Sequence, residues 1–583
     1  MNKKNISSTY NNLSENLLKK LREIVGPKNF FNEKEIKWTY AFGGTIFEKE
    51  WIPDLILRPK TSKQIAQILK LANKERIPII PRGNGTSLSG GAMTPYGGIV
   101  LDLSSMNKIL NIDIENNMVE LEPGVICDYL NEELKEYGYF FPPDPGSSSV
   151  ATIGGMCATN AGGVQAFKYG VTKEYVMYLE VVLPDGHKLK LGTEVLKSVS
   201  SYNIKDLFIG SEGTLGIITK IGLKIRPLPE YRKLGMFIFD DVEKIQEAVL
   251  AIRRNAIMPN LLEFMGKVIF RAVKQYLGGE FRDYPEGYVL LAETDGFSPE
   301  EVENSFSQIF DLIIQHNPIF QKIARNDDER DKLIQARKAN LPAVARIKPT
   351  VCVEDCTIKI TNFSETIRKI EQIPEKINAE RLKVAVISHM EGNLHPKFLF
   401  NENNEQDLKE FQKAMDYLYE NIILPSGGSL TGEHGIGKVK TPYLPLEHDE
   451  SVIKLMHQFK KMFDPNMILN PGIGKGDQRP LKIINSNRVL KNQPNKNLEL
   501  NCIRCGFCIA TCPSKIHYEL ETYSPRGRLN ILNGLVHGDL DPNKMISEIF
   551  HSCQLCGLCL VKCPAGVKTY NIFEQTREIL HND

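Results

Sequence analysis

The 583-residue sequence has no excess of charge of either sign, because 72 Lys and Arg residues face 71 Asp and Glu residues and the net charge is +1. A general electrostatic attraction to nucleic acid is therefore not expected. No apolar run reaches the ~18 residues that a transmembrane helix needs. The N-terminal segment contains Lys but no apolar core, so no secretory signal is visible. With 42% hydrophobic and 25% charged residues, the composition is typical of a soluble globular protein.

Changes in sequence pattern predict an α+β chain with three folded units. In the first unit, short apolar strands alternate with helices, as in a βαβ arrangement. Thr61 and Gln64 have the spacing of a capping box, which predicts a helix over 61–76. In the second unit the expected helices are longer, at 242–254, 299–315 and 404–421. The predicted units are 1–230, 231–476 and 498–583, with the polar segment 477–497 as a linker.

Cysteine is sparse over most of the chain and concentrated near its C-terminal end. Eight of the 12 Cys residues form two runs with the spacing C-x2-C-x2-C-x3-C-P. This is the spacing of bacterial ferredoxins, in which the fourth Cys of each run ligates the other cluster. Zinc, the alternative, favours two CxxC pairs over a triple run that ends in Cys-Pro. One [4Fe–4S] cluster is expected on Cys502, Cys505, Cys508 and Cys563, and a second on Cys553, Cys556, Cys559 and Cys512.

Two of the remaining Cys residues, Cys352 and Cys356, are not predicted to form a disulfide. In a strand over 351–358, residues four apart share a face but lie ~13 Å from each other. That separation exceeds the reach of a disulfide bond. Both are expected to be buried, small apolar side chains.

Three glycine-rich segments indicate a nucleotide site. The first, 81–91, follows a predicted strand, and its Gly residues allow backbone N–H groups to approach a pyrophosphate. A plain turn is the alternative for this loop alone, because it matches neither GxGxxG nor a P-loop. The second segment lies within 141–163, and the third spans 210–218. Together they favour a nucleotide site over a plain turn.

In this order, the three segments resemble the FAD-binding domain of the vanillyl-alcohol oxidase/p-cresol methylhydroxylase (PCMH) superfamily. From about residue 37 to 474 the chain is most similar to the FAD-linked glycolate oxidase and D-lactate dehydrogenase family. The C-terminal part, with Ser524-Pro525-Arg526-Gly527-Arg528 between the Cys runs, resembles the ferredoxin portion of the glycolate oxidase iron–sulfur subunit. The resemblance implies a PCMH-type FAD-binding domain, an α+β substrate (cap) domain and a helical 2×[4Fe–4S] ferredoxin-type domain, as in a fusion of two subunits.

The resemblance also implies which residues bind FAD. A tethering His or Cys is not evident, so the FAD is expected to be non-covalent. The pyrophosphate is expected at Pro81, Arg82, Gly83, Asn84, Gly85, Thr86, Ser87, Gly90 and Gly91. The flavin ring or the ribityl chain is expected at Pro143, Thr152, Gly155, Asn160, Gly162 and Ile218. The remaining expected FAD-binding residues are Glu212, Gly213, Gly216 and Asn470.

One basic segment is a candidate for binding a substrate carboxylate. Arg337 lies in QARKANLPAVARIKP, and a guanidinium binds a carboxylate in a bidentate manner. From spacing alone, a solvated helix face is the alternative. The segment resembles the R-K-x-A-x-P-A-x-x-R-x-x-P motif of glycolate oxidases, and this resemblance implies that Arg337 binds the carboxylate.

Two further segments resemble the family motifs H-x-G-D-G-N-L-H and G-E-H-G-x-G. The resemblance implies that His389, His395 and Glu433 bind Zn or Mn and that His434 is the general base. A base is needed because the hydroxyl proton must leave while hydride passes to the flavin. The two His residues are six positions apart here, whereas the family motif has seven. One imidazole is therefore expected to point in a different direction.

The expected function is oxidation of a small D-2-hydroxy acid, D-lactate or glycolate, with electrons leaving one at a time through the two clusters. The acceptor is expected to be a quinone or a partner that carries the cysteine-rich domain absent after Cys563. One alternative is a larger D-2-hydroxy dicarboxylate such as D-2-hydroxyglutarate. Another is a non-catalytic flavin/iron–sulfur electron-transfer subunit. A cytoplasmic location, peripheral to the inner face of the membrane through a partner, fits this reading.

Overall fold

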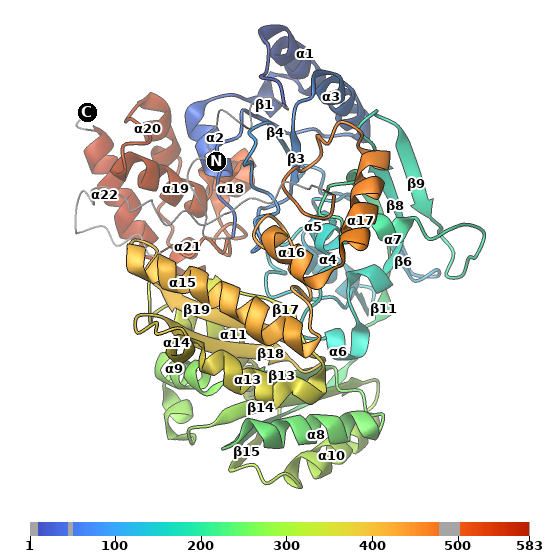
Figure 1. Cartoon of the computed structure of the whole chain (residues 1–583), viewed down its shortest axis with the longest axis vertical. Helices are drawn as coiled ribbons and strands as arrows, with labels where there is room; N and C mark the ends of the chain where they lie inside the picture. Colours follow the sequence, from blue (N-terminus) through green and yellow to red (C-terminus); the bar gives the residue numbers. More distant parts are fainter. Residues whose placement is uncertain (1–9, 45–50, 477–501, 582–583) are drawn as a thin grey trace.

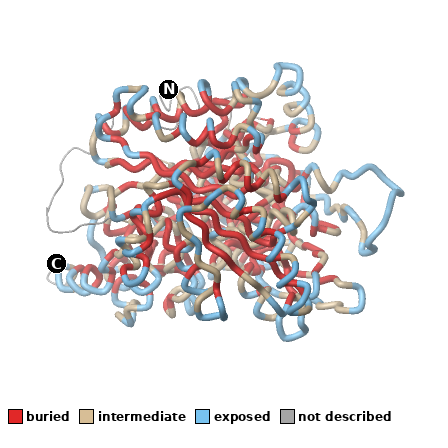
Figure 2. The backbone as a smooth tube through the Cα atoms, turned by 90° about the horizontal axis from the view of Figure 1, so that it is seen from below, coloured by how far each residue is buried: buried red, intermediate tan, exposed pale blue. Residues whose placement is uncertain are grey.

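The computed structural model describes residues 10–44, 51–476 and 502–581, and the predicted linker 477–497 lies outside these ranges. Figure 1 shows an N-terminal α/β lobe, a second lobe built on one large sheet, and a helical C-terminal lobe. In Figure 2 the buried backbone gathers in the interior, and exposed backbone lies around the rim. No helix in the described ranges is long and apolar enough to cross a membrane. The arrangement is the α+β fold class that the sequence predicts.

The N-terminal lobe begins with a small mixed sheet and its helices. Its elements are α1 (Glu15–Val25), β1 (Phe30–Phe31), α2 (Lys34–Tyr40), β2 (Leu55–Leu57), α3 (Ser62–Glu75), β3 (Ile79–Arg82) and β4 (Ile99–Asp102). The strand order is β1-β2-β4-β3, and β2, β4 and β3 run parallel. α3 buries Ile65 and Leu69 from one face. The Thr61 side chain accepts a hydrogen bond from the Gln64 N–H, which confirms the predicted helix start.

A five-stranded antiparallel sheet completes this lobe. Its elements are β5 (Ile109–Asp113), β6 (Met118–Leu121), α4 (Cys127–Lys135), α5 (Ile153–Thr159), α6 (Ala166–Tyr169), β8 (Val176–Val182), β9 (Lys188–Gly192), α7 (Lys205–Phe208) and β10 (Ile217–Lys224). The strand order is β5-β6-β10-β8-β9. Two short strands, β7 (Tyr139–Phe140) and β11 (Arg226–Pro227), pair beside it. β8 and β9 form a hairpin, with Gly186 at φ +80° in its turn.

The second lobe is an antiparallel sheet in the order β15-β12-β14-β13-β18-β19-β16, with β17 beside β19. Its strands are β12 (Tyr231–Phe239), β13 (Leu261–Met265), β14 (Tyr288–Gly296), β15 (Phe320–Ile323), β16 (Thr350–Val353), β17 (Cys356–Thr357), β18 (Lys383–His389) and β19 (Asn393–Phe400). Its helices are α8 (Val242–Arg254), α9 (Lys267–Leu277), α10 (Pro299–Ile314), α11 (Asp327–Lys338), α12 (Asn340–Val344), α13 (Phe363–Glu371), α14 (Ile373–Lys376) and α15 (Glu405–Tyr417). α8, α10 and α13 cover one face, and α9, α11 and α12 cover the other.

The predicted strand 351–358 is wrong as a single element. β16 ends at Val353 and β17 begins at Cys356, because the strand is interrupted at Asp355, which accepts hydrogen bonds from a neighbouring loop. Cys352 and Cys356 are free thiols. Cys356 is fully buried, as expected, whereas Cys352 is half-buried because it lies in β16 at the edge of the sheet.

After the second lobe the chain returns to the first. α16 (Leu444–Glu447) and α17 (Glu450–Phe463) lead to a parallel bridge between Leu469 and Ile79 of β3. The buried Lys460 donates hydrogen bonds to Asp464 and to the carbonyl groups of Thr214 and Leu469. Figure 1 accordingly shows α17 beside the N-terminal lobe.

The C-terminal lobe consists of α18 (Pro513–Tyr518), α19 (Pro525–Val536), α20 (Lys544–His551), α21 (Leu558–Lys562) and α22 (Thr569–His581). α19 packs on α2 of the N-terminal lobe. Trp38 of α2 is 2% exposed, and its indole N–H donates to the Asn530 carbonyl at 2.8 Å. The helical lobe is therefore anchored directly on the N-terminal lobe.

Candidate active site and cofactor sites

The first glycine-rich loop follows β3 and meets the second segment at the start of α5. Nδ2 of Asn84 donates to the carbonyl of Val150 at 2.9 Å. A Cβ atom on Gly83 would collide with the side chain of Thr152, which caps α5. Two segments that the sequence assigns to one cofactor are therefore in direct contact.

The backbone donors of this loop are left open. The N–H groups of residues 83–87 have no hydrogen-bond acceptor within the described part of the chain. Gly85 is buried among them at φ +61°. Buried unpaired donors cost free energy unless a ligand accepts their hydrogen bonds, and a pyrophosphate offers such acceptors. The loop fits the pyrophosphate of FAD.

Two residues of the loop support it from behind. The guanidinium of Arg82 packs against Gly85 of the loop, where a Cβ atom would collide with it, and donates to the carbonyl groups of Tyr40 and Phe42. The hydroxyl of Ser87 accepts a hydrogen bond from the N–H of Gly91 at 3.0 Å. Arg82 therefore holds the loop in place through its contact with Gly85 and its hydrogen bonds to the segment 40–42.

The third segment packs on α5. The N–H of Glu212 donates to the carbonyl of Ala158 at 2.8 Å. Asn160 ends α5 in the left-handed region, at φ +56°. Gly213, at φ +69°, lies against the ring of Pro81, where a side chain would collide. All three glycine-rich segments thus gather around one short helix.

Glu212 and Asn470 join the first two lobes. The Glu212 carboxylate accepts hydrogen bonds from the N–H groups of Ile436 and Gly437, both at 2.9 Å. The amide of Asn470 donates to the carbonyl groups of Gly91 and Glu212, both at 2.8 Å. These two predicted FAD residues hold the nucleotide loop against the loop that carries the predicted base.

The other predicted FAD residues fall into two groups. Gly162 faces the loop 431–437, because a Cβ atom on it would approach Oε2 of Glu433 to 2.5 Å. Gly216 packs against Val181 in the interior of the lobe, and Ile218 is buried nearby in β10. The structure therefore places Gly162 beside Glu433, whereas Gly216 packs in the interior of the N-terminal lobe.

The two predicted His ligands lie on one hairpin. His389 ends β18 and His395 lies in β19, with His389 opposite Asn393 in the register. An even separation along a hairpin places both side chains on the same face. The two ring centroids are 5.0 Å apart. The six-residue spacing therefore leaves both imidazoles facing one site.

The loop 431–437 brings Glu433 opposite this pair. Oε1 of Glu433 lies 3.1 Å from Nε2 of His395 and 3.4 Å from Nε2 of His389. Oδ2 of Asp355 holds the loop by accepting from the N–H groups of Gly432, Glu433 and His434 at 2.8–3.1 Å. Two imidazoles and one carboxylate that converge in this way suit a divalent cation such as Zn or Mn.

The pKa shifts of the site residues are consistent with binding of a divalent cation and with a neutral His434. Burial would raise the pKa of Glu433, but the two His residues lower it well below its ordinary value. Burial would lower the pKa of His389, but the carboxylates of Glu263 and Glu433 raise it well above its ordinary value. Burial lowers the pKa of His434, against the opposing charge of Asp355. His434 is therefore neutral near neutral pH and can accept a proton.

Arg337 reaches the same site through Glu263. Nε of Arg337 pairs with the fully buried Glu263 carboxylate, which also bonds Nδ1 of His389. This contact sets the orientation of His389, so that its Nε2 faces Glu433. The terminal NH2 groups of Arg337 donate no hydrogen bond within the described residues. They are open to a substrate carboxylate.

A buried lysine lies beside this arginine. Lys397 is 2% exposed and occupies the same face of β19 as His395. Its Nζ donates to Oδ1 of Asn340, and no carboxylate among the described residues pairs with it. Burial and the charge of Arg337 lower its pKa well below the ordinary value. A bound anion would restore its charge.

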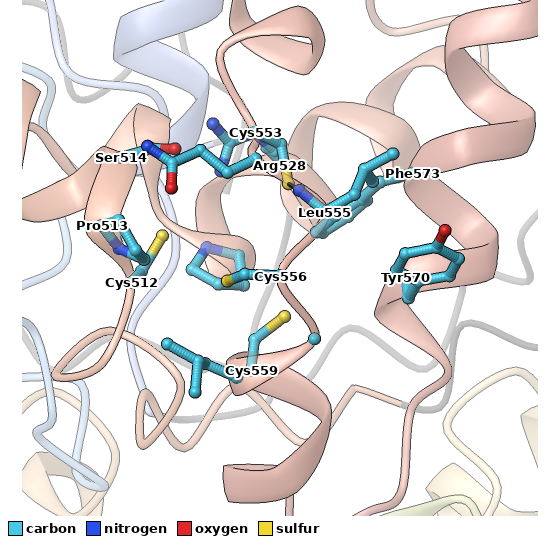
Figure 3. A pocket seen from close by; sticks show the side chains of 14 residues that line it. Cys512, Pro513, Ser514, Arg528, Cys553, Leu555, Cys556, Cys559, Tyr570 and Phe573 are labelled. Atoms are coloured by element: carbon cyan, nitrogen blue, oxygen red, sulfur yellow. Dashed lines mark hydrogen bonds between the residues drawn. The ribbon is translucent and has the colours of Figure 1, made fainter.

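Four thiols line one pocket of the helical lobe. Cys512 of the first run lies there with Cys553, Cys556 and Cys559 of the second run, and Figure 3 shows these side chains around the pocket. Arg528 also lines it. Four thiols contributed by two sequence runs form the donor set that a [4Fe–4S] cluster requires.

The other four thiols also come together across the two runs. Burial raises the pKa of Cys505 to about 12, and the nearby Cys502 and Cys563 add to the rise. Burial also raises the pKa of Cys508, and the thiols of Cys502 and Cys505 in its own run add to the rise. Thiolates this close are stabilised by binding iron, which fits a first cluster on Cys502, Cys505, Cys508 and Cys563.

Sequence reasoning missed three residues of the active site. Glu263 and Lys397 each lie inside an otherwise apolar strand, LLEFM and NLHPKFLF. A charged residue at such a position was a usable signal, and Lys397 also follows His395 at the two-residue period of a strand. Asp355 gave no comparable signal, because its role depends on a loop that is distant in the sequence.

Comparisons with known proteins agree with this geometry. Residues 53–192 match the model of an FAD binding domain, residues 228–473 that of the C-terminal domain of FAD linked oxidases, and residues 500–567 that of a 4Fe-4S dicluster domain. Glycolate oxidase subunit GlcD of Bacillus subtilis is 34% identical over 79% of this chain and 97% of its own. D-lactate dehydrogenase of Anaerostipes hadrus is 33% identical over 79% of this chain and 98% of its own.

Two solved structures share the fold. A substrate-bound p-cresol methylhydroxylase superposes with a TM-score of 0.65 at 19% identity, covering 79% of this chain and 96% of its own. An alkyldihydroxyacetonephosphate synthase superposes with a TM-score of 0.62 at 21% identity, covering 81% and 87%. At these identities the likeness concerns the fold alone.

Proposed function

Because the chain belongs to the family of FAD-linked oxidases that includes glycolate oxidase subunit GlcD and D-lactate dehydrogenase, we propose that it oxidises a small D-2-hydroxy acid, D-lactate or glycolate, to the 2-oxo acid. The observation that carries the proposal is the convergence of Arg337, Glu433 and His434 beside the glycine-rich loop at Gly162. The 4Fe-4S dicluster domain supports onward transfer of single electrons.

Each residue of the site has one task in this reaction. Bound FAD supplies the hydride acceptor. The terminal NH2 groups of Arg337 bind the substrate carboxylate. Nε2 of His434, 3.8 Å from Oε1 of Glu433, takes the hydroxyl proton. Glu433 and the two His residues would hold a divalent cation, which polarises the hydroxyl.

An anaerobic titration tests the proposal. D-Lactate or glycolate, added to the cluster-loaded protein, is expected to bleach the flavin band and then the broad cluster absorbance. L-Lactate, the matched control, is expected to leave both unchanged. If dithionite bleaches both cofactors but no hydroxy acid does, the enzyme proposal fails and the non-catalytic electron-transfer reading replaces it.

Lys397 favours a second candidate, a D-2-hydroxy dicarboxylate such as D-2-hydroxyglutarate. A buried lysine without a carboxylate partner is costly unless a ligand supplies the charge. Arg337 lies near enough to lower its pKa. Two adjacent cations could receive the two carboxylates of one substrate, whereas D-lactate carries only one.

The variant Lys397→Met separates these candidates. If Lys397 binds a second carboxylate, turnover of D-2-hydroxyglutarate is expected to fall by about 10–100-fold, the loss for one charge-assisted contact, while turnover of D-lactate stays within about twofold. The measurement is kcat/KM for both acids. Equal losses on both acids would instead place Lys397 at the carboxylate that they share.

The electron acceptor belongs to the same proposal. We expect a quinone or a partner protein with a cysteine-rich redox domain, reached in the cytoplasm or at the inner face of the membrane. The exposure of Cys556, at the second cluster pocket, supports transfer to an outside acceptor.

A further inference from the structure

Arg526 connects the two cofactor regions. It lies in the first turn of α19 and is 1% exposed. Nη2 donates to the carbonyl of Asn84 at 2.7 Å, and Nη1 donates to the carbonyl of Gly85 at 3.3 Å. These carbonyl groups belong to the loop 83–87, whose N–H groups are expected to bind the FAD pyrophosphate.

The same guanidinium reaches the first Cys run. Nη1 also donates to the carbonyl of Arg504, between Cys502 and Cys505, at 3.2 Å. Glu521 accepts from Nε at 2.8 Å and from Nη2 at 3.0 Å. All five N–H donors are thereby used, so the guanidinium is fixed in position.

The charge of Arg526 lies between the loop that is expected to bind the FAD pyrophosphate and the Cys run that is expected to bind the first cluster. Burial lowers the pKa of Arg526, but the carboxylate of Glu521 and, to a smaller extent, the nearby thiols of Cys508 and Cys505 raise it above its ordinary value. Arg82, itself 2% exposed, lies close enough for the two guanidinium groups to interact. The carboxylates of Glu521 and of the buried Asp102 oppose the charges of these two arginines. Of the two, Arg526 is the cation that contacts both the FAD loop and the first Cys run.

Arg528 provides the contrast within the same helix. It is also fully buried, but its donors reach Ile549, Tyr523 and Ser552, all in the helical lobe. It lines the second cluster pocket. Cys556 of that pocket is exposed. The first cluster region therefore adjoins the FAD loop, and the second lies toward solvent.

We propose that Arg526 is a positioning residue that holds the FAD loop against the first cluster, and that electrons from the flavin reach the cluster on Cys502, Cys505, Cys508 and Cys563 before the second. FAD that carries two electrons returns to its oxidised form by reducing two clusters by one electron each, and its protons pass to water. A reduced cluster carries one more negative charge, so the buried cation stabilises it. The inference rests on the proposed binding of FAD and the clusters, but not on the identity of the substrate.

Three variants of the full-length, cluster-loaded protein test this. Arg526→Gln is expected to lower the reduction potential of the first cluster and to raise the FAD dissociation constant about tenfold, because two loop contacts are lost. Glu521→Gln is expected to raise that potential, because it removes the neighbouring negative charge. The control Arg528→Gln is expected to affect the second cluster and to leave FAD affinity unchanged. Potentials are read from redox titrations followed by electron paramagnetic resonance, and affinity from flavin fluorescence.

Photochemical reduction of the flavin then tests the order without any substrate. Arg526→Gln is expected to slow the bleaching of the clusters about tenfold after the flavin is reduced. Unchanged FAD affinity and unchanged first-cluster potential would overturn the role of Arg526. If Arg526→Gln does not fold, Glu521→Gln decides alone, and the absence of a positive shift of the first cluster overturns the proposal. Failure of D-lactate or glycolate to reduce the protein would refute only the proposed function.

Discussion

Replacing His434 by Ala is expected to slow the reduction of the flavin by substrate by about 10²–10⁴-fold, the usual contribution of a general base. Burial keeps this imidazole neutral, and its Nε2 points toward the Glu433 carboxylate and the pair of His ligands. Nε2 of His389 and Nε2 of His395 lie closer to Oε1 of Glu433, at 3.4 Å and 3.1 Å, than Nε2 of His434 does at 3.8 Å. Anaerobic stopped-flow absorbance at saturating D-lactate or glycolate measures the rate.

Two controls separate the base from the metal site. His448→Ala, at the end of α16 beside Glu447, is expected to leave the rate unchanged. His395→Ala is expected to lose bound Zn or Mn, whereas His434→Ala is expected to retain it. A rate within about twofold of the wild type in His434→Ala would reject the base assignment and support the non-catalytic electron-transfer reading.

The sequence carried most of the fold because its signals are local. The helix at 61–76 was predictable from Thr61 and from apolar spacing, and both lie within the helix itself. The break between β16 and β17 within 351–358 was not predictable, since it depends on Asp355, which holds a loop that comes much later in the sequence. A local pattern contains no information about that contact.

In the candidate site, too, the residues in local sequence motifs were predictable, whereas those that act through distant contacts were not. The residues in motifs, such as His395 and Glu433, were predicted, and the structure brings them together. The residues that orient them were not predicted. Glu263 contacts Arg337 and His389, and these three residues come from three separate elements of the fold. Arg526 stood in a recognisable segment, yet its contact with Gly85 joins residues 441 positions apart. Such roles emerge only from tertiary packing.

The assignment of cysteines to clusters makes the second large prediction. Because Cys512 lines the pocket of the second run, Cys512→Ser is expected to lose the second cluster and about half of the bound iron, while the first cluster survives. Cys505→Ser is expected to lose the first cluster and keep the second. Electron delivery from the reduced flavin to an outside acceptor is expected to be abolished in both variants.

The same two variants also test the order in which electrons pass from the flavin to the two clusters. After photochemical reduction of the flavin, the remaining cluster of Cys512→Ser is expected to bleach, since the first cluster adjoins the FAD loop through Arg526. The remaining cluster of Cys505→Ser is expected to stay oxidised, because the second cluster is then cut off from the flavin. Cys352→Ser, a free thiol outside both runs, is the control and is expected to retain both clusters. If Cys505→Ser and Cys512→Ser lose the same resonance signal, each run holds its own cluster and the crossed ligation is wrong.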